Sequence, residues 1–180
     1  VETFKEDINC AIRVGEGQGN TIKSLVFSRN QFNEEYLNAC RELGIESVRT
    51  NPNVWWWNID THQESKWKRL SRGLDAYIKL DRHTSFKLSS LTKDFPIQIP
   101  ASRLLRSWSP RYKFLNRMRV RRIKQEMNYA AEHNEAYHLW WHPHNFGWYP
   151  EENLRDLEEI LKHYQSLQKH YGMQSLTMGE

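Results

Sequence analysis

Apolar side chains recur every three or four residues in five segments, and this spacing predicts five helices. The predicted helices cover residues 1–14, 30–43, 64–80, 110–131 and 151–171. Asn30 and Asn33 are candidate N-caps for the second helix, and Gly44 is a typical C-terminal stop. Pro110 suits the first turn of the fourth helix, where the missing N–H costs nothing. The sequence therefore predicts a chain rich in helices with defined ends.

The two longest predicted helices each have an apolar stripe that indicates a buried face. In the helix that begins at Pro110, the predicted buried face consists of Phe114, Met118, Ile123, Met127 and Ala131. In the last helix, the corresponding face consists of Leu154, Leu157, Ile160, Leu161, Tyr164 and Leu167. Acidic residues fill the first turn of this last helix and Gly172 ends it, which favours the same assignment.

Short apolar runs between the helices predict strands. These runs cover residues 22–27, 45–48, 97–99, 136–142 and 173–178, whereas residues 50–63 and most of 81–109 are loop-like. Strands that alternate with helices are typical of a parallel sheet or a (β/α) barrel. With 180 residues and no convincing linker, the chain is expected to form one domain or a large part of one.

Composition narrows the function classes. Aromatic residues make up 13% of the chain and include eight tryptophans, which argues against disorder and suits either a packed core or sugar binding. The formal net charge is only +4, so a nucleic-acid partner is not expected. The basic run Arg117–Lys124 keeps helical spacing and is interpreted as a solvated helix face rather than a phosphate site. Cys10 and Cys40 have no zinc-site spacing and are interpreted as buried free thiols.

The strongest chemical signal is the segment from His138 to Gly147, HLWWHPHNFG, at the end of a predicted strand. Active-site residues gather at the C-terminal strand ends of (β/α) barrels. Three interpretations remain open from the residues alone: His142 is a general acid or base, or His138, His142 and His144 bind a metal, or the histidines are structural.

Two further signals are weaker. Arg29 follows the predicted strand 22–27 and could bind a carboxylate, although a surface arginine would look the same. Asp60, His62 and Glu64 alternate in a tryptophan-rich loop, where a plain polar loop is a simpler interpretation than a metal site.

Five segments together resemble the NodB-like polysaccharide deacetylases, especially members associated with bacterial gene clusters for surface polysaccharides. The segments are SLVFSRNQFNEEYL, VRTNP, IPASRLLR, YHLWWHPHNFG and MQSLTMGE. The resemblance implies that residues 1–180 form the C-terminal portion of a single catalytic domain, a partial distorted (β/α) barrel without its N-terminal strands. Ser28 stands where close relatives have proline.

The resemblance also implies roles for individual residues. Leu139-Trp-Trp-His142 matches the Leu-x-x-His motif, whose histidine protonates the leaving amine, and Arg29 matches the arginine that positions the aspartate base. Trp140, Trp141, His144, Asn145, Arg49 and Trp55 are expected to contact the substrate. The metal-binding aspartate, the H-x-x-x-H pair and the aspartate base have no match in this chain, so they are expected upstream of Val1.

The implied activity is metal-dependent removal of N-acetyl groups from amino sugars of a polysaccharide or oligosaccharide, with a divalent metal that is usually zinc. The chain by itself is expected to have little activity. A non-catalytic carbohydrate-binding remnant of the barrel is the alternative. The compartment stays open between the cytoplasm and the cell envelope.

Overall fold

The computed structural model describes residues 1–57, 65–80 and 83–180, and these form two compact units. Unit 1 comprises Val1–Thr50, Ser89–Pro100 and Ser175–Glu180, and unit 2 comprises Asn51–Leu88 and Ala101–Gln174. Each unit is described by itself. None of the helices in the described ranges has the length and apolar character needed to cross a membrane.

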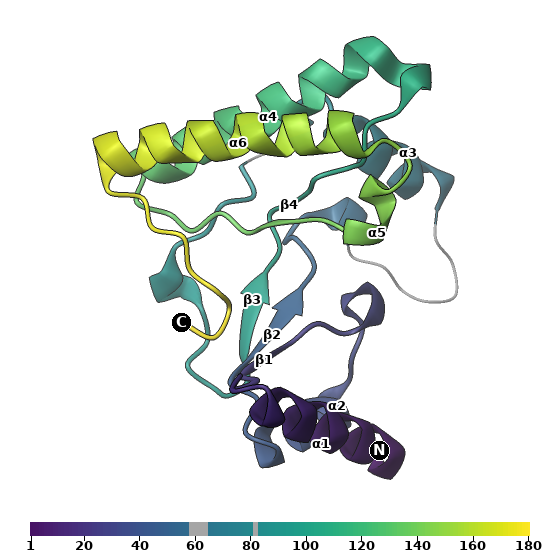
Figure 1. The fold of residues 1–180 in the computed structure, drawn as a ribbon, viewed down its shortest axis with the longest axis vertical. Helices are drawn as coiled ribbons and strands as arrows, with labels where there is room; N and C mark the ends of the chain where they lie inside the picture. The colour runs from purple at the N-terminus through teal and green to yellow at the C-terminus, as the bar shows by residue number, and fades with distance from the viewer. Residues whose placement is uncertain (58–64, 81–82) are drawn as a thin grey trace. The chain divides into compact units, whose positions relative to one another are not determined.

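Unit 1 is a small parallel sheet with two helices (Figure 1). Its elements are α1 (Glu2–Gly17), β1 (Ser24–Leu25), η1 (Ser28–Asn30), α2 (Glu34–Glu42), β2 (Ser47–Thr50) and β3 (Ile97–Pro100). The strand order is β1-β2-β3, with Leu25 opposite Val48 and Val48 opposite Gln98. Parallel strands joined through helices agree with the mixed α/β class predicted from the alternation of elements.

The ends of α2 follow the capping signals in the sequence. The Asn33 side chain accepts a hydrogen bond from the Tyr36 N–H, and Gly44 has a φ of 74° that a residue with a side chain adopts only with strain. Leu37, Cys40, Ile45 and Val48 form the buried core of this unit, against which Phe4, Ile8 and Ile12 of α1 pack. Cys10, in contrast, is exposed, so the prediction of a buried thiol is confirmed for Cys40 and wrong for Cys10.

Unit 2 combines a two-stranded parallel ladder with helices. Its elements are η2 (Trp55–Trp57), α3 (Lys66–Asp75), β4 (Arg103–Leu104), η4 (Pro110–Tyr112), α4 (Lys113–Glu132), β5 (Leu139–Trp140), α5 (Pro143–Phe146) and α6 (Pro150–Tyr171). The short η3 (Leu88–Ser90) lies where the sequence passes from unit 2 to unit 1. Strand β4 pairs with β5, Arg103 opposite Leu139 and Leu104 opposite Trp140.

Helices α4 and α6 lie side by side and run in the same direction (Figure 1). Three side-chain pairs join them at nearly constant sequence offsets: Arg119–Asp156, Lys124–Glu159 and Asn128–His163. The apolar core of the unit lies beneath this pair and includes Leu105, Val120, Ile123, Met127, Ile160 and Leu167. The predicted apolar faces are therefore right for Ile123, Met127, Ile160 and Leu167. They are wrong for Phe114, Leu154 and Leu161, which are exposed.

A buried ionic network ties α3, β4 and α4 together. Glu126 is fully buried and accepts hydrogen bonds from Arg103 Nε and Nη2, at 2.5 and 2.7 Å. Arg122 Nη2 lies 2.9 Å from Glu126, and Arg103 also bonds Asp75. The prediction that Arg117–Lys124 is a solvated face is thus wrong for Arg119 and Arg122, because both arginines are buried and pair with carboxylates.

Several predicted element bounds change. The run at 173–178 forms no strand, since its backbone makes no ladder, and the strand at 136–142 shortens to β5. The helix predicted over 64–80 is helical from Lys66 to Asp75, and the segment that follows the predicted strand 136–142 contains α5. Within the described residues the strands form one three-stranded sheet and one two-stranded ladder and no closed barrel.

Candidate functional site

The candidate site lies at the C-terminal end of the β4–β5 ladder in unit 2. The last ladder bond runs from the Leu105 N–H to the Trp140 carbonyl at 2.8 Å. Leu105 and Leu139 pack into the core beneath α4 and α6, so the alternate positions Leu104 and Trp140 face away from it. His142 follows Trp140 in the same phase and directly precedes α5, with extended backbone angles of φ −102° and ψ 110°.

His142 is exposed and held between two rings. Its imidazole makes an edge contact with Trp140, with ring centroids 5.2 Å apart at 90°, and lies 5.2 Å from the ring of His144. The Asn145 N–H donates to the His142 carbonyl at 3.0 Å, so the backbone of α5 fixes the residue as well. An exposed imidazole at a fixed position is able to give a proton to a bound ligand.

Two exposed indoles, Trp141 and Trp148, lie near His142 in the sequence, and a third, Trp55, belongs to the same unit. Trp148 is 82% exposed, Trp55 is 54% exposed, and Trp141 is 36% exposed and stacks on Phe146 at a centroid distance of 6.3 Å. An exposed indole presents a large apolar face on which a ligand is able to stack. The flat face of an indole matches the C–H face of a pyranose ring.

The other predicted substrate residues of this segment lie close by in the sequence but differ in setting. His144 is exposed on α5, whereas Asn145 is half-buried there. The backbone of His138 is bound on both sides by Ser102, whose Oγ accepts from the His138 N–H at 3.0 Å while its N–H donates to the His138 carbonyl. His138 is therefore a structural residue of the ladder, in contrast to His142.

The described residues do not hold a metal ion. Across 1–57, 65–80 and 83–180 no three His, Cys, Asp or Glu side chains come together in a way that could bind one. The interpretation of His138, His142 and His144 as a metal cluster is therefore not supported. Asp60, His62 and Glu64, the other predicted set, lie outside the described residues.

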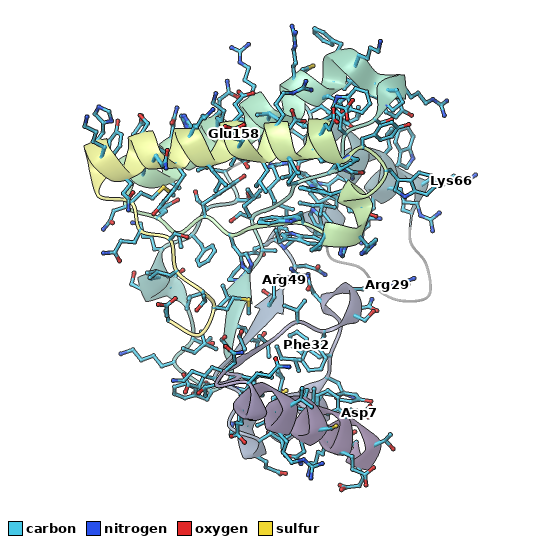
Figure 2. All side chains as sticks on the ribbon, viewed as in Figure 1. Asp7, Arg29, Phe32, Arg49, Lys66 and Glu158 are labelled. Atoms are coloured by element: carbon cyan, nitrogen blue, oxygen red, sulfur yellow. The ribbon has the colours of Figure 1, made fainter. Side chains whose placement is uncertain are left out.

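Arg29 and Arg49, the two arginines predicted for the site, belong to unit 1 (Figure 2). Arg29 is exposed on η1 with a φ of 55°, and Asn30 has a φ of 54°. The Asn30 side chain accepts a hydrogen bond from Arg49 Nε at 2.9 Å, and burial lowers the pKa of Arg49. Two successive non-glycine residues with positive φ are rare and occur where surrounding structure enforces them, often at functional sites.

The structure adds Arg106, which sequence reasoning missed. Arg106 stands two residues beyond the end of β4, as His142 stands two residues beyond β5. Because the strands are parallel and Leu104 is opposite Trp140, Arg106 and His142 both lie beyond the C-terminal end of the ladder. In the sequence, Arg106 is marked only by its place in the segment IPASRLLR. The strand in that segment has two residues, which is too short to show an alternation of apolar and polar positions.

No protein-family model, no curated protein and no solved structure matches this chain.

Proposed function

We propose that this chain is part of a polysaccharide N-deacetylase in which His142 protonates the leaving amine. The observation that carries the proposal is the placement of His142: an exposed imidazole, in a Leu-x-x-His segment, beyond the C-terminal end of a parallel strand. The exposed indoles of Trp141 and Trp148 support a sugar ligand for the same part of the chain.

The role of His142 follows from the chemistry of amide hydrolysis. An amine leaves readily as a neutral molecule and very poorly as an amide anion, so a proton must reach the nitrogen before the C–N bond breaks. His142 would donate that proton from its ring, and its edge contact with Trp140 would keep the ring in one orientation. Trp141 and Trp148 would stack on the sugar and His144 and Asn145 would bond its hydroxyl groups.

A divalent metal such as zinc, when bound, would polarise the acetamide carbonyl and lower the pKa of a bound water. The described residues contain no group of three His, Cys, Asp or Glu side chains that could hold it. In the same proposal Arg29 positions the aspartate base, and Arg49 and Trp55 contact the substrate. The resemblance in sequence supports these roles.

Acetate release tests the proposal. The full-length protein, supplied with zinc, should release acetate from an N-acetylglucosamine oligosaccharide, and a chelator should stop the release. His142→Ala should lower turnover by about 10²- to 10⁴-fold, the usual contribution of a general acid. His170→Ala, which removes an exposed histidine from the last turn of α6, is the matched control and should retain most turnover. Full turnover by His142→Ala would remove this residue from the acid role.

A second candidate function is carbohydrate binding without catalysis, favoured by Trp148, which is 82% exposed and contributes nothing to the core. This candidate predicts oligosaccharide binding that is unaffected by a chelator and by His142→Ala, with no acetate released. Trp148→Ala should weaken binding under both proposals, so acetate release is the measurement that separates them.

A further inference from the structure

Helix α3 of unit 2 presents its apolar side chains to water. Trp67 is 73% exposed, and the apolar residues that follow it at helical spacing are exposed as well: Leu70, Leu74 and Ile78. The Ile78 N–H donates to the Leu74 carbonyl at 3.0 Å, so the helical turn continues to this residue. Positions three and four residues apart share one face of a helix, so these four side chains form a continuous exposed surface, the α3 stripe.

The opposite face of α3 carries polar residues and contacts the rest of unit 2. Asp75 is buried and pairs with Arg103 and Arg122, and Arg72 Nη1 donates to the Trp56 carbonyl at 2.8 Å. These contacts fix the orientation of the helix and keep the α3 stripe on the outside. A helix on the surface of a globular domain usually buries its apolar face, and a continuous apolar surface left exposed marks an interaction site.

The charged residues beside the α3 stripe are mainly basic. Lys66 is exposed at the start of α3 (Figure 2), and Arg69 and Lys79 are exposed as well. In the described range 65–80, Asp75 is the one acidic residue, and it is buried in the ionic network. Acidic residues flank this range in the sequence at positions 64 and 81, but basic residues still outnumber acidic ones when these are included. The α3 surface therefore combines an apolar stripe with positive charge.

Helix α6 shows that exposed leucines alone do not make such a surface. Leu154 and Leu161 are exposed to about the same extent as Leu70. Glu158 lies one helical turn from both of these α6 leucines and is exposed, as is Glu151 at the start of the helix. An anionic partner would be repelled by these carboxylates and attracted by the basic residues of α3.

We propose that the α3 stripe binds the surface of a membrane that contains anionic lipids, with α3 lying in the plane of the interface. Leucine and tryptophan side chains on one face of a helix enter the boundary between headgroups and acyl chains, while neighbouring lysine and arginine side chains contact anionic headgroups. Tryptophan is enriched at this depth because its ring is apolar and its N–H is polar. With 10 residues, α3 is too short to span a bilayer, which requires about 20.

Charge favours lipid over the other occupants of an apolar surface. Two copies of α3 placed face to face would bring like charges together, and a protein partner would have to supply an acidic rim around its own apolar patch. An anionic bilayer supplies both the negative charge and the apolar interior. The inference concerns side chains outside the proposed catalytic site and does not rest on the proposed function.

Vesicle co-sedimentation of the 180-residue chain tests the inference. Partition constants are measured for vesicles of phosphatidylcholine and for vesicles of equal parts phosphatidylcholine and phosphatidylglycerol. Wild type should bind the anionic vesicles more tightly by about tenfold or more, since each basic residue near an anionic surface contributes about fivefold. Added salt should shrink this preference.

Two double variants locate the contact. Leu70→Gln with Leu74→Gln should weaken binding to anionic vesicles by about 100-fold, about tenfold for each leucine withdrawn from lipid. Leu154→Gln with Leu161→Gln is the matched control on α6 and should bind as wild type does. All four leucines are exposed, so the urea midpoints of both variants should match that of wild type.

Two single variants test the charge. Lys66→Gln should weaken binding to anionic vesicles by about fivefold and leave binding to neutral vesicles unchanged. Lys169→Gln, which removes an exposed lysine from the last turn of α6, should change neither.

Three results would overturn the inference. The first is no preference of wild type for anionic vesicles, and the second is an equal effect of the α3 and α6 double variants. The third is self-association of wild type that Leu70→Gln with Leu74→Gln abolishes, without vesicle binding, which would assign the α3 stripe to a second copy of the chain. Acetate release is measured separately, so each of these results leaves the proposed function to its own test.

Discussion

Replacement of Glu126 by alanine should destabilise unit 2 more than any other single substitution in its ionic network. Glu126 is 0% exposed and takes two hydrogen bonds from Arg103, one from the Tyr137 hydroxyl at 3.0 Å, and an ion pair from Arg122. Burial lowers the pKa of Arg103, but the hydrogen bond and charge of Glu126, together with Tyr137 and Asp75, outweigh burial and raise that pKa. Without Glu126, Asp75 is the one carboxylate among the described residues that still pairs with the two buried guanidinium groups of Arg103 and Arg122.

The magnitude follows from the charge left behind. Removal of one partner of a buried ion pair costs about 3–5 kcal/mol, because the remaining charge stays desolvated. For a urea slope of about 2 kcal/mol/M, this loss moves the unfolding midpoint down by about 2 M. Glu126→Gln keeps one acceptor oxygen and the shape of the side chain, so it should cost less, about 2 kcal/mol.

Tryptophan fluorescence is the right assay because all eight tryptophans lie in unit 2. Its urea transition therefore reports unit 2 even if unit 1 unfolds separately. Glu158→Ala on α6 is the control, since Glu158 pairs only with the exposed Lys162, and its midpoint should match wild type. If Glu126→Ala shifted the midpoint no more than Glu158→Ala, the network would not be the buried, mutually dependent set described above.

Two other properties of unit 2 are open to measurement. Leu105 is 2% exposed in the core, so Leu105→Ala should lower the free energy of unfolding by about 2–5 kcal/mol. Leu154 is 57% exposed, so Leu154→Ala should change this free energy little. Equal effects of the two substitutions in urea unfolding would contradict the packing. Burial, followed by the charge of Lys124, lowers the pKa of His163 below its usual 6.5, so the unfolded chain binds more protons and stability should fall as the pH drops from 6.5 through the folded-state pKa. His163→Gln should flatten that decline in midpoints measured between pH 5 and 8, and an unchanged slope would show that other groups cause it.

The helices could be predicted because their signals are local. The spacing of Ile123 and Met127, the cap at Asn33 and the stop at Gly172, which has a φ of 71°, all lie within a turn or two of the residues they affect. Strands β4 and β5 depend instead on each other, with two paired residues each. A ladder that short leaves no alternation in the sequence, so only the partner strand reveals it.

The ionic network shows the same limit for side chains. Arg119 and Arg122 have the spacing of a solvated basic face. The carboxylates that pair with them lie partly on α4, at Glu126, and partly on segments distant in the sequence, at Asp75 and Asp156. A sequence pattern records which residues share a helix face and does not record what packs on it. For the candidate site, His142 and its aromatic neighbours could be selected from one continuous segment, whereas Arg106 could not, because its hydrogen-bond partners lie on α3 and α4.

Hydrolysis of two acetyl substrates by wild type and His142→Ala is the most direct test of the central claim. An N-acetylated tetrasaccharide needs a proton on its leaving nitrogen, whereas 4-nitrophenyl acetate releases a stable phenolate and needs none. Protonation by His142 predicts that His142→Ala loses about 10²- to 10⁴-fold in turnover of the tetrasaccharide and stays within a few-fold of wild type on the aryl ester. Equal losses on both substrates would assign His142 to the structure of the site, and no loss on either would contradict its role altogether.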